Sequence, residues 1–138
     1  MPVIERLVAA VAVFLAAHFA MGFINSSAGG PGGNFLFPFA TDAPSRWVFG
    51  SLEGMLGLLV PVMIALAGMA VLAFFLAFLA TFGLWIPADL WRPLILVGTS
   101  CSIALLVLHP SIYAALPLVL NVGLAWVAWT SAWSPAAS

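Results

Sequence analysis

The fold is decided by residues 54–80, which read GMLGLLVPVMIALAGMAVLAFFLAFLA. None of these side chains carries a charge or a hydrogen-bonding group, and only Pro61 and three glycines interrupt the run. As a helix rising about 1.5 Å per residue, the stretch would reach about 40 Å, more than the ~30 Å hydrocarbon layer of a bilayer. It therefore predicts a transmembrane helix that tilts or bends, with Pro61 as the place for a bend.

The composition places the rest of the chain in the same environment. The 138 residues are 65% hydrophobic and 5% charged, whereas a soluble domain carries about 25% charged residues. Lysine is absent and the net charge is −1, so no basic patch exists and we expect no nucleic acid partner. The single cysteine, Cys101, lies inside an apolar segment, which excludes a membrane thiol pair of the C-x-x-C type. We interpret the chain as an integral membrane protein.

Three further apolar runs complete a set of four expected helices. Residues 7–24 contain one polar side chain, His18. A cleaved secretory signal usually has a shorter apolar centre, so we interpret this run as the first transmembrane helix. Gly83 with Pro87, and His109 before Pro110, predict the ends of later helices. We expect an all-α, up-down four-helix bundle forming one transmembrane domain over residues 1–138, with helices at about residues 4–24, 52–82, 90–108 and 111–130.

The connection between the first two helices, residues 25–51, is long, glycine-rich and aromatic. It contains SSAGGPGGN at residues 26–34, followed by five aromatic rings and few charges. Such a loop is typical of the interfacial zone of a membrane. In the next connection, Trp85 and Trp91 are expected to be interface anchors, and Trp126, Trp129 and Trp133 to mark one membrane boundary.

The arginines predict the orientation. Four helices place both termini on one side, with Arg6 and Arg92 on that side and Arg46 on the other. The positive-inside rule then predicts cytoplasmic termini, and we expect the bacterial inner membrane.

Small residues recur at four-residue spacing on two helices, which predicts close-packed faces directed toward each other. They are Ala12, Ala16 and Ala20 on the first helix, and Gly57, Pro61 and Ala65 on the second.

Polar side chains inside the later helices have two interpretations. Thr99 to Ser102 could line a polar path, but hydroxyls in membrane helices usually bond to their own backbone or to a neighbouring helix. On the fourth helix, Tyr113, Pro117 and Asn121 share one face. Asn121 is expected to bond the backbone carbonyl that Pro117 leaves free.

His18 and Glu53 are the candidate cofactor-binding residues. Both are expected near the outer side of the membrane, where a carboxylate beside an imidazole could carry protons or contact a quinone or pigment. The alternative is a hydrogen bond that satisfies both groups and fixes helix register. Known light-harvesting helices have a small residue four positions before the pigment-ligating histidine, whereas Phe14 precedes His18 here.

The layout resembles the DoxX-like four-helix membrane proteins. The residues that carry the resemblance are Arg6 at a boundary, Ser51-Leu-Glu-Gly-Met-Leu-Gly57 at the start of the second helix, and Trp91-Arg-Pro93 at the start of the third. The resemblance implies a role linked to quinone-dependent oxidation. The chain differs from that pattern in having no lysine and a glycine-rich, aromatic first loop.

These observations favour a non-catalytic function. The sequence shows no metal-ligand cluster, no nucleophile with its base and no phosphate loop, so we assign no catalytic or metal-binding residue and expect no intrinsic cofactor. We expect an accessory or stabilising transmembrane subunit of a larger membrane complex of respiratory or photosynthetic electron transport. Its partners would be other transmembrane subunits and membrane lipids, with lipid, quinone or pigment bound at helix surfaces. The alternatives are a DoxX-like quinone-linked oxidoreductase subunit and a small homo-oligomeric transporter or channel.

Overall fold

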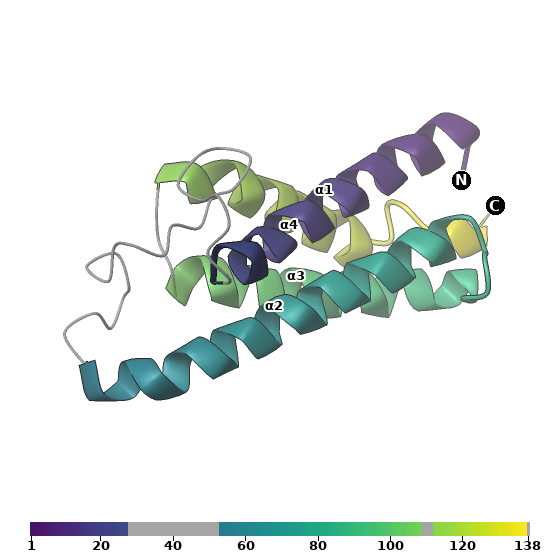
Figure 1. The fold of residues 1–138 in the computed structure, drawn as a ribbon. Coiled ribbons are helices and arrows are strands. Elements are labelled where there is room, and N and C mark those ends of the chain that lie inside the picture. Colours follow the sequence, from purple (N-terminus) through teal and green to yellow (C-terminus); the bar gives the residue numbers. More distant parts are fainter. Residues whose placement is uncertain (28–52, 109–111, 138) are drawn as a thin grey trace.

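The computed structural model describes the backbone of residues 1–27, 53–108 and 112–137, and the regular elements in these ranges are helical (Figure 1). Side chains are described for residues 1–24, 61–108 and 113–136. The four α-helices of this part are α1 (Val3–Ser27), α2 (Glu53–Thr81), α3 (Trp91–Leu108) and α4 (Ala115–Trp129). The expected all-α class with four helices is confirmed for these ranges. Most of the expected interfacial loop, the His109–Pro110 turn and the side chain of Glu53 lie outside the described residues.

Three of the four helices are long and apolar enough to cross a membrane. The segments are Val3–Ile24, Pro61–Thr81 and Ala88–Leu108, and α4 is shorter at 15 residues. Three short 3-10 turns flank these helices: Ala88–Leu90 precedes α3, Ile112–Ala114 precedes α4, and Pro135–Ala137 follows α4. Three of the four apolar runs of the sequence therefore correspond to helices of membrane-spanning length.

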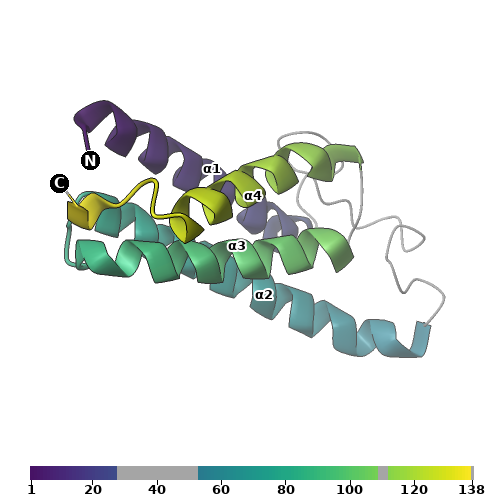
Figure 2. The ribbon, with the colours of Figure 1, turned by 180° about the vertical axis from the view of Figure 1, so that it is seen from behind.

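Consecutive helices run in opposite directions, and both termini lie at one end of the molecule (Figures 1 and 2). We call this the terminal end; α1 and α3 begin there, and α2 ends there. Helix α2 packs extensively against α1 and α3, and α3 packs against α4, whereas α1 and α4 touch only slightly. At the opposite end, the first turns of α2 project beyond the other helices (Figures 1 and 2). The helices thus form a row that closes weakly between α1 and α4.

Gly83 ends α2 as its sequence position predicts. Its φ of +64° is the left-handed conformation that glycine adopts without a steric penalty. The Leu84 N–H donates to the Leu79 carbonyl over 3.0 Å, and the Gly83 N–H donates to the Ala80 carbonyl over 3.1 Å. This pair of bonds is the Schellman motif, which satisfies the last carbonyls of a helix and turns the chain away.

Helix α4 ends with the same motif, although no glycine is present. Ser131 takes the left-handed position, with φ of +56°. The Ala132 N–H donates to the Val127 carbonyl over 3.1 Å, and the Ser131 N–H donates to the Ala128 carbonyl over 3.4 Å. A serine here carries a conformational cost that glycine would avoid.

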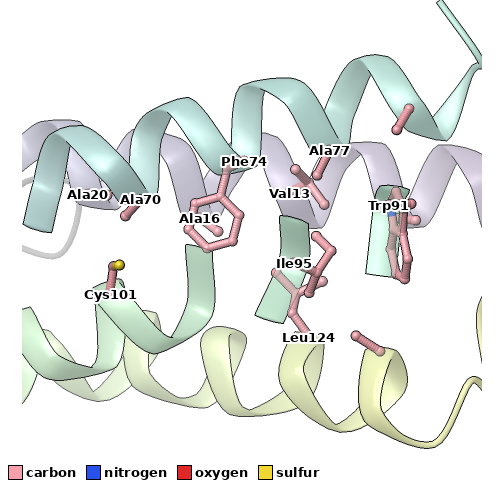
Figure 3. Packing of buried hydrophobic residues seen from close by; sticks show 13 residues of the cluster. Val13, Ala16, Ala20, Ala70, Phe74, Ala77, Trp91, Ile95, Cys101 and Leu124 are labelled. Atoms are coloured by element: carbon pink, nitrogen blue, oxygen red, sulfur yellow. The ribbon is translucent and has the colours of Figure 1, made fainter. Parts of the chain in front are cut away.

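The main core lies where α1, α2, α3 and α4 meet (Figure 3). Alanines dominate the α1 and α2 faces, which lets the two backbones approach closely. Ala16 and Ala20 are fully buried, so the small-residue face predicted on α1 is confirmed at these positions. The residues of this core are Ala9, Val13, Ala16, Ala20, Ala70, Phe74, Ala77, Ala80, Trp91, Ile95, Cys101, Leu124 and Ala128.

The predicted packing face of α2 is wrong. Pro61 and Ala65 are exposed, and Gly57 lies outside the described side chains. The buried face instead carries Met63 and Ala67 in a second cluster with Phe23 of α1, and then the alanines of the main core. Helix α2 is apolar on all sides, so its sequence holds no polar stripe to show which face points outward.

Gly98 of α3 packs against the Phe74 side chain of α2. A Cβ atom at this position would lie 2.8 Å from Cε1 and 2.9 Å from Cδ1 of Phe74. Phe74 is fully buried in the main core, so its ring packs directly on the backbone of α3. A glycine leaves room for the ring, because a Cβ at this position would force the ring or α3 to move.

Trp91 is part of the core, which corrects its expected role as an interface anchor. It is fully buried, and its indole Nε1–H donates to the Thr81 hydroxyl over 3.0 Å. Thr81 in turn donates to the Ala77 carbonyl over 2.9 Å. A buried indole N–H needs an acceptor, and Thr81 supplies one across the α2–α3 connection. The bond therefore joins the end of α2 to the start of α3.

Candidate functional site

Four polar side chains are buried among those the structure describes, and three of them lie on α3 and α4. They are Thr99 and Ser102 on α3, Asn121 on α4, and Thr81 at the end of α2. The Thr99 hydroxyl lies 2.7 Å from the Ile95 carbonyl of its own helix. This is the backbone bond expected of a membrane helix hydroxyl, and it favours the structural interpretation of Thr99 over a polar path.

Asn121 bonds a different carbonyl from the one predicted. Its Nδ2 donates to the carbonyl of Pro117 itself over 2.8 Å. A proline has no N–H, so the carbonyl four residues before it loses its helical donor. For Pro117 this is the carbonyl of Tyr113. The Asn121 Oδ1 is buried and has no hydrogen-bond partner among the described residues. The side chain therefore stabilises its own helix with one end and leaves an acceptor inside the bundle.

His18 lies on α1 and is half-buried. Its ring packs edge-on against Phe19, with ring centroids 5.7 Å apart and an interplanar angle of 64°. Thus the imidazole belongs to an aromatic pair on α1.

The backbone places His18 and Glu53 at different levels of the bundle. In the core, Ala20 lies level with Ala70, and Val13 lies level with Ala77 (Figure 3). In this antiparallel register, the α2 residue level with His18 lies about 19 residues after Glu53, which corresponds to about 28 Å along the helix. The described helices do not bring the two residues together. A quinone or pigment contact at either residue stays a prediction, because the side chain of Glu53 is outside the described part.

An apolar opening lies between α1 and α4, where the two helices touch only slightly. We call it the α1–α4 groove. It consists of two cavities of about 330 and 350 Å³, both of which are lined by Ala12 and Leu120. The remaining lining residues are Leu7, Val8, Val11 and Leu15 of α1, Val119, Gly123, Leu124 and Val127 of α4, and Trp133.

The size of the groove decides what it can hold. Each of the two cavities, of about 330 and 350 Å³, can take large side chains or a flexible hydrocarbon chain. Its apolar lining offers no group that would fix a polar ligand. The groove could not be predicted from the sequence, because Gly123 and Ala12 are small residues on separate helices and belong to no common motif.

A second feature is the terminal end, where the charged side chains of the described residues gather. Glu5 and Arg6 are in the first turns of α1, Asp89 precedes α3, and Arg92 is in the first turn of α3. Arg92 Nη2 donates to the carbonyl of Trp129 over 3.0 Å. A guanidinium in this position caps the last turn of α4 and is favoured by the helix dipole.

Among the described residues, no group of three or more His, Cys, Asp or Glu side chains could hold a metal ion. Cys101 is buried and free, and the chain has no second cysteine. No protein-family model, curated protein or solved structure matches the chain. The resemblance to the DoxX-like proteins therefore depends only on the residues quoted above.

Proposed function

We propose that the chain is an accessory or stabilising transmembrane subunit that packs against other membrane subunits and has no catalytic role of its own. The observation that carries this proposal is the α1–α4 groove. The helices form a row whose two outer members barely meet, and the gap between them is apolar. Such a surface is typical of a protein that completes its packing with a partner or a lipid.

The outer face of α1 supports the same proposal. Large apolar side chains are exposed along it, with Leu7 at 54%, Val11 at 58% and Phe14 at 63%. In each of the three candidate spans, less than half of the most apolar window is buried inside the chain. Most of the helix surface is therefore free to contact lipid or the helices of a larger complex, and we propose complexes of respiratory or photosynthetic electron transport.

We propose that the helices cross the bacterial inner membrane as an up-down bundle with cytoplasmic termini. The terminal end carries Arg6 and Arg92, the two arginines of the described residues, and positive residues are retained on the cytoplasmic side. In this arrangement the α1–α4 groove opens into the acyl layer. Partner side chains, lipid acyl chains or the tail of a quinone or pigment would occupy it.

The experiment that tests the proposal begins with extraction of native membranes in a mild detergent. A native gel, mass spectrometry of co-migrating chains and an absorption spectrum of the same band would follow. We expect the chain to migrate in a large assembly with other membrane subunits. Migration alone or as a small homo-oligomer would contradict the proposal, and quinol oxidation or liposome conductance would then test the oxidoreductase and transporter alternatives.

A pair of variants locates the contact. Gly123→Leu fills the α1–α4 groove, and Gly68→Leu adds the same side chain on α2. A Cβ at either glycine meets nothing within 4 Å, so both variants are expected to fold. We expect Gly123→Leu to lose co-migrating chains and Gly68→Leu to retain them. Equal retention by both variants would show that the groove is not the contact surface.

A further inference from the structure

The connection between α2 and α3 contains a strained residue. Trp85 has a φ of +60°, and the Ile86 N–H donates to the Leu84 carbonyl over 2.7 Å across it. This is a γ-turn with positive φ, which is rare and strained for an L-amino acid. A glycine or asparagine would be the usual residue at such a position.

The Trp85 side chain receives little compensation from the chain itself. It is 94% exposed, whereas Trp91, six residues later, is fully buried. Trp91 gains both core packing and a hydrogen bond to Thr81, and Trp85 gains almost no contact area. A strained residue persists when something else stabilises it, and such residues gather at functional positions. For Trp85 the described residues supply almost none of this stabilisation through the side chain.

The surroundings of Trp85 indicate the partner. The turn lies at the terminal end, together with the charged side chains of the described residues (Figures 1 and 2). Two more exposed indoles, Trp129 at 70% and Trp126 at 67%, are in the last turn of α4. Arg92 bonds the Trp129 carbonyl, so this turn lies near the start of α3. Exposed indoles beside charged groups match the boundary between lipid headgroups and acyl chains, where the ring is partly solvated and partly in hydrocarbon.

We propose that the strained Trp85 turn is an anchor that binds the headgroup–acyl boundary of the bilayer at the terminal end, with Trp129 and Trp126 as deeper members of the same site. The turn holds the indole away from the bundle, where it is 94% exposed. Trp126 is three residues before Trp129 and lies about 4.5 Å deeper along α4. The inference requires membrane insertion but not the accessory role proposed above.

The test uses the full-length chain in phosphatidylcholine vesicles with bromine at a shallow or a deep acyl position. The emission of Trp85 is obtained as the difference between the wild-type protein and Trp85→Gly, and that of Trp126 from Trp126→Phe. We expect the Trp85 emission to be quenched more by shallow than by deep bromine. For Trp126, we expect the ratio of deep to shallow quenching to be higher than for Trp85. A Trp85 component that emits like an indole in water and is quenched at neither depth would overturn the proposal.

A second measurement separates anchoring from folding. Trp85→Gly and Trp85→Asn relieve the strain because both residues tolerate positive φ. In detergent micelles we expect both variants to unfold at the same temperature as the wild type or above it. A lower unfolding temperature for both would show that the indole stabilises the chain itself, and the anchor proposal would then fail.

Discussion

The contact between Gly98 and Phe74 gives the sharpest test of the packing. Replacing Gly98 by alanine places a Cβ 2.8 Å from Cε1, 2.9 Å from Cδ1 and 3.1 Å from Cζ of the Phe74 ring. Carbon atoms pack at about 3.5–4.0 Å, so the ring or α3 must move by about 0.7 Å or more. Phe74 is fully buried between helices, which leaves the ring little room to move.

The expected cost follows from two opposing terms. Overpacking a filled core costs about 1–3 kcal/mol, and replacing glycine by alanine inside a helix returns about 0.5–1 kcal/mol. Gly98→Ala should therefore destabilise the protein by up to about 2.5 kcal/mol. Gly68→Ala is the matched control, because its Cβ meets nothing within 4 Å, and this variant should be neutral or slightly more stable.

Unfolding in detergent, followed by circular dichroism at increasing temperature or denaturant, measures both variants. The double variant Gly98→Ala with Phe74→Leu tests the cause, since a smaller side chain makes room for the new methyl group. We expect the pair to be less destabilised than the sum of the single variants, as for residues in direct contact. If Gly98→Ala is as stable as Gly68→Ala, the ring does not pack on α3 as described.

Four more substitutions test the polar and backbone features. Thr81→Val removes the acceptor of the buried Trp91 indole and should lower the unfolding free energy by about 1–3 kcal/mol in the same assay. If Thr81→Val lowers it equally when Trp91 is already replaced by phenylalanine, the bond is unimportant. Ser131→Gly should raise the unfolding free energy by about 0.5–1 kcal/mol, because φ at this position is positive. Gly83→Ala should lower the unfolding free energy by about 1 kcal/mol, because φ at Gly83 is also positive. A change in the opposite direction in either variant would contradict these helix ends. Asn121→Leu should be neutral or stabilising by about 1 kcal/mol, because the amide oxygen is buried without a partner among the described residues; a loss above about 2 kcal/mol would mean that this oxygen has one.

The helical class could be predicted from the sequence because the apolar runs leave no other structure that satisfies the backbone in lipid. The end of α2 could also be predicted, since Gly83 occupies the position where a left-handed residue is needed. These features depend on local residues and on segment length. They do not depend on which neighbour a helix meets.

The packing faces could not all be predicted. Helix α2 is apolar around its whole circumference, so the row of Gly57, Pro61 and Ala65 was as acceptable as the alanines that are in fact buried. Likewise, a tryptophan at a helix start is typical of an interface anchor. Only the threonine ten residues before Trp91 indicates that its indole has an acceptor inside the bundle.

The candidate site was less predictable than the fold. The α1–α4 groove arises from a weak contact between the first and last helices, and no local sequence pattern predicts how closely these two helices pack. Glu53 and His18 were paired by their expected depth, but two features separate them. Helix α1 continues nine residues past His18 to Ser27, and α2 extends past the other helices at its start (Figure 1).

The bond between Trp91 and Thr81 has a consequence for how the chain is assembled. It closes a short connection between two helices that also pack tightly at Gly98 and Phe74. Short loops cost little entropy to close. The α2–α3 hairpin is thus the part that can form first during biogenesis. Helices α1 and α4 would then add to its two sides.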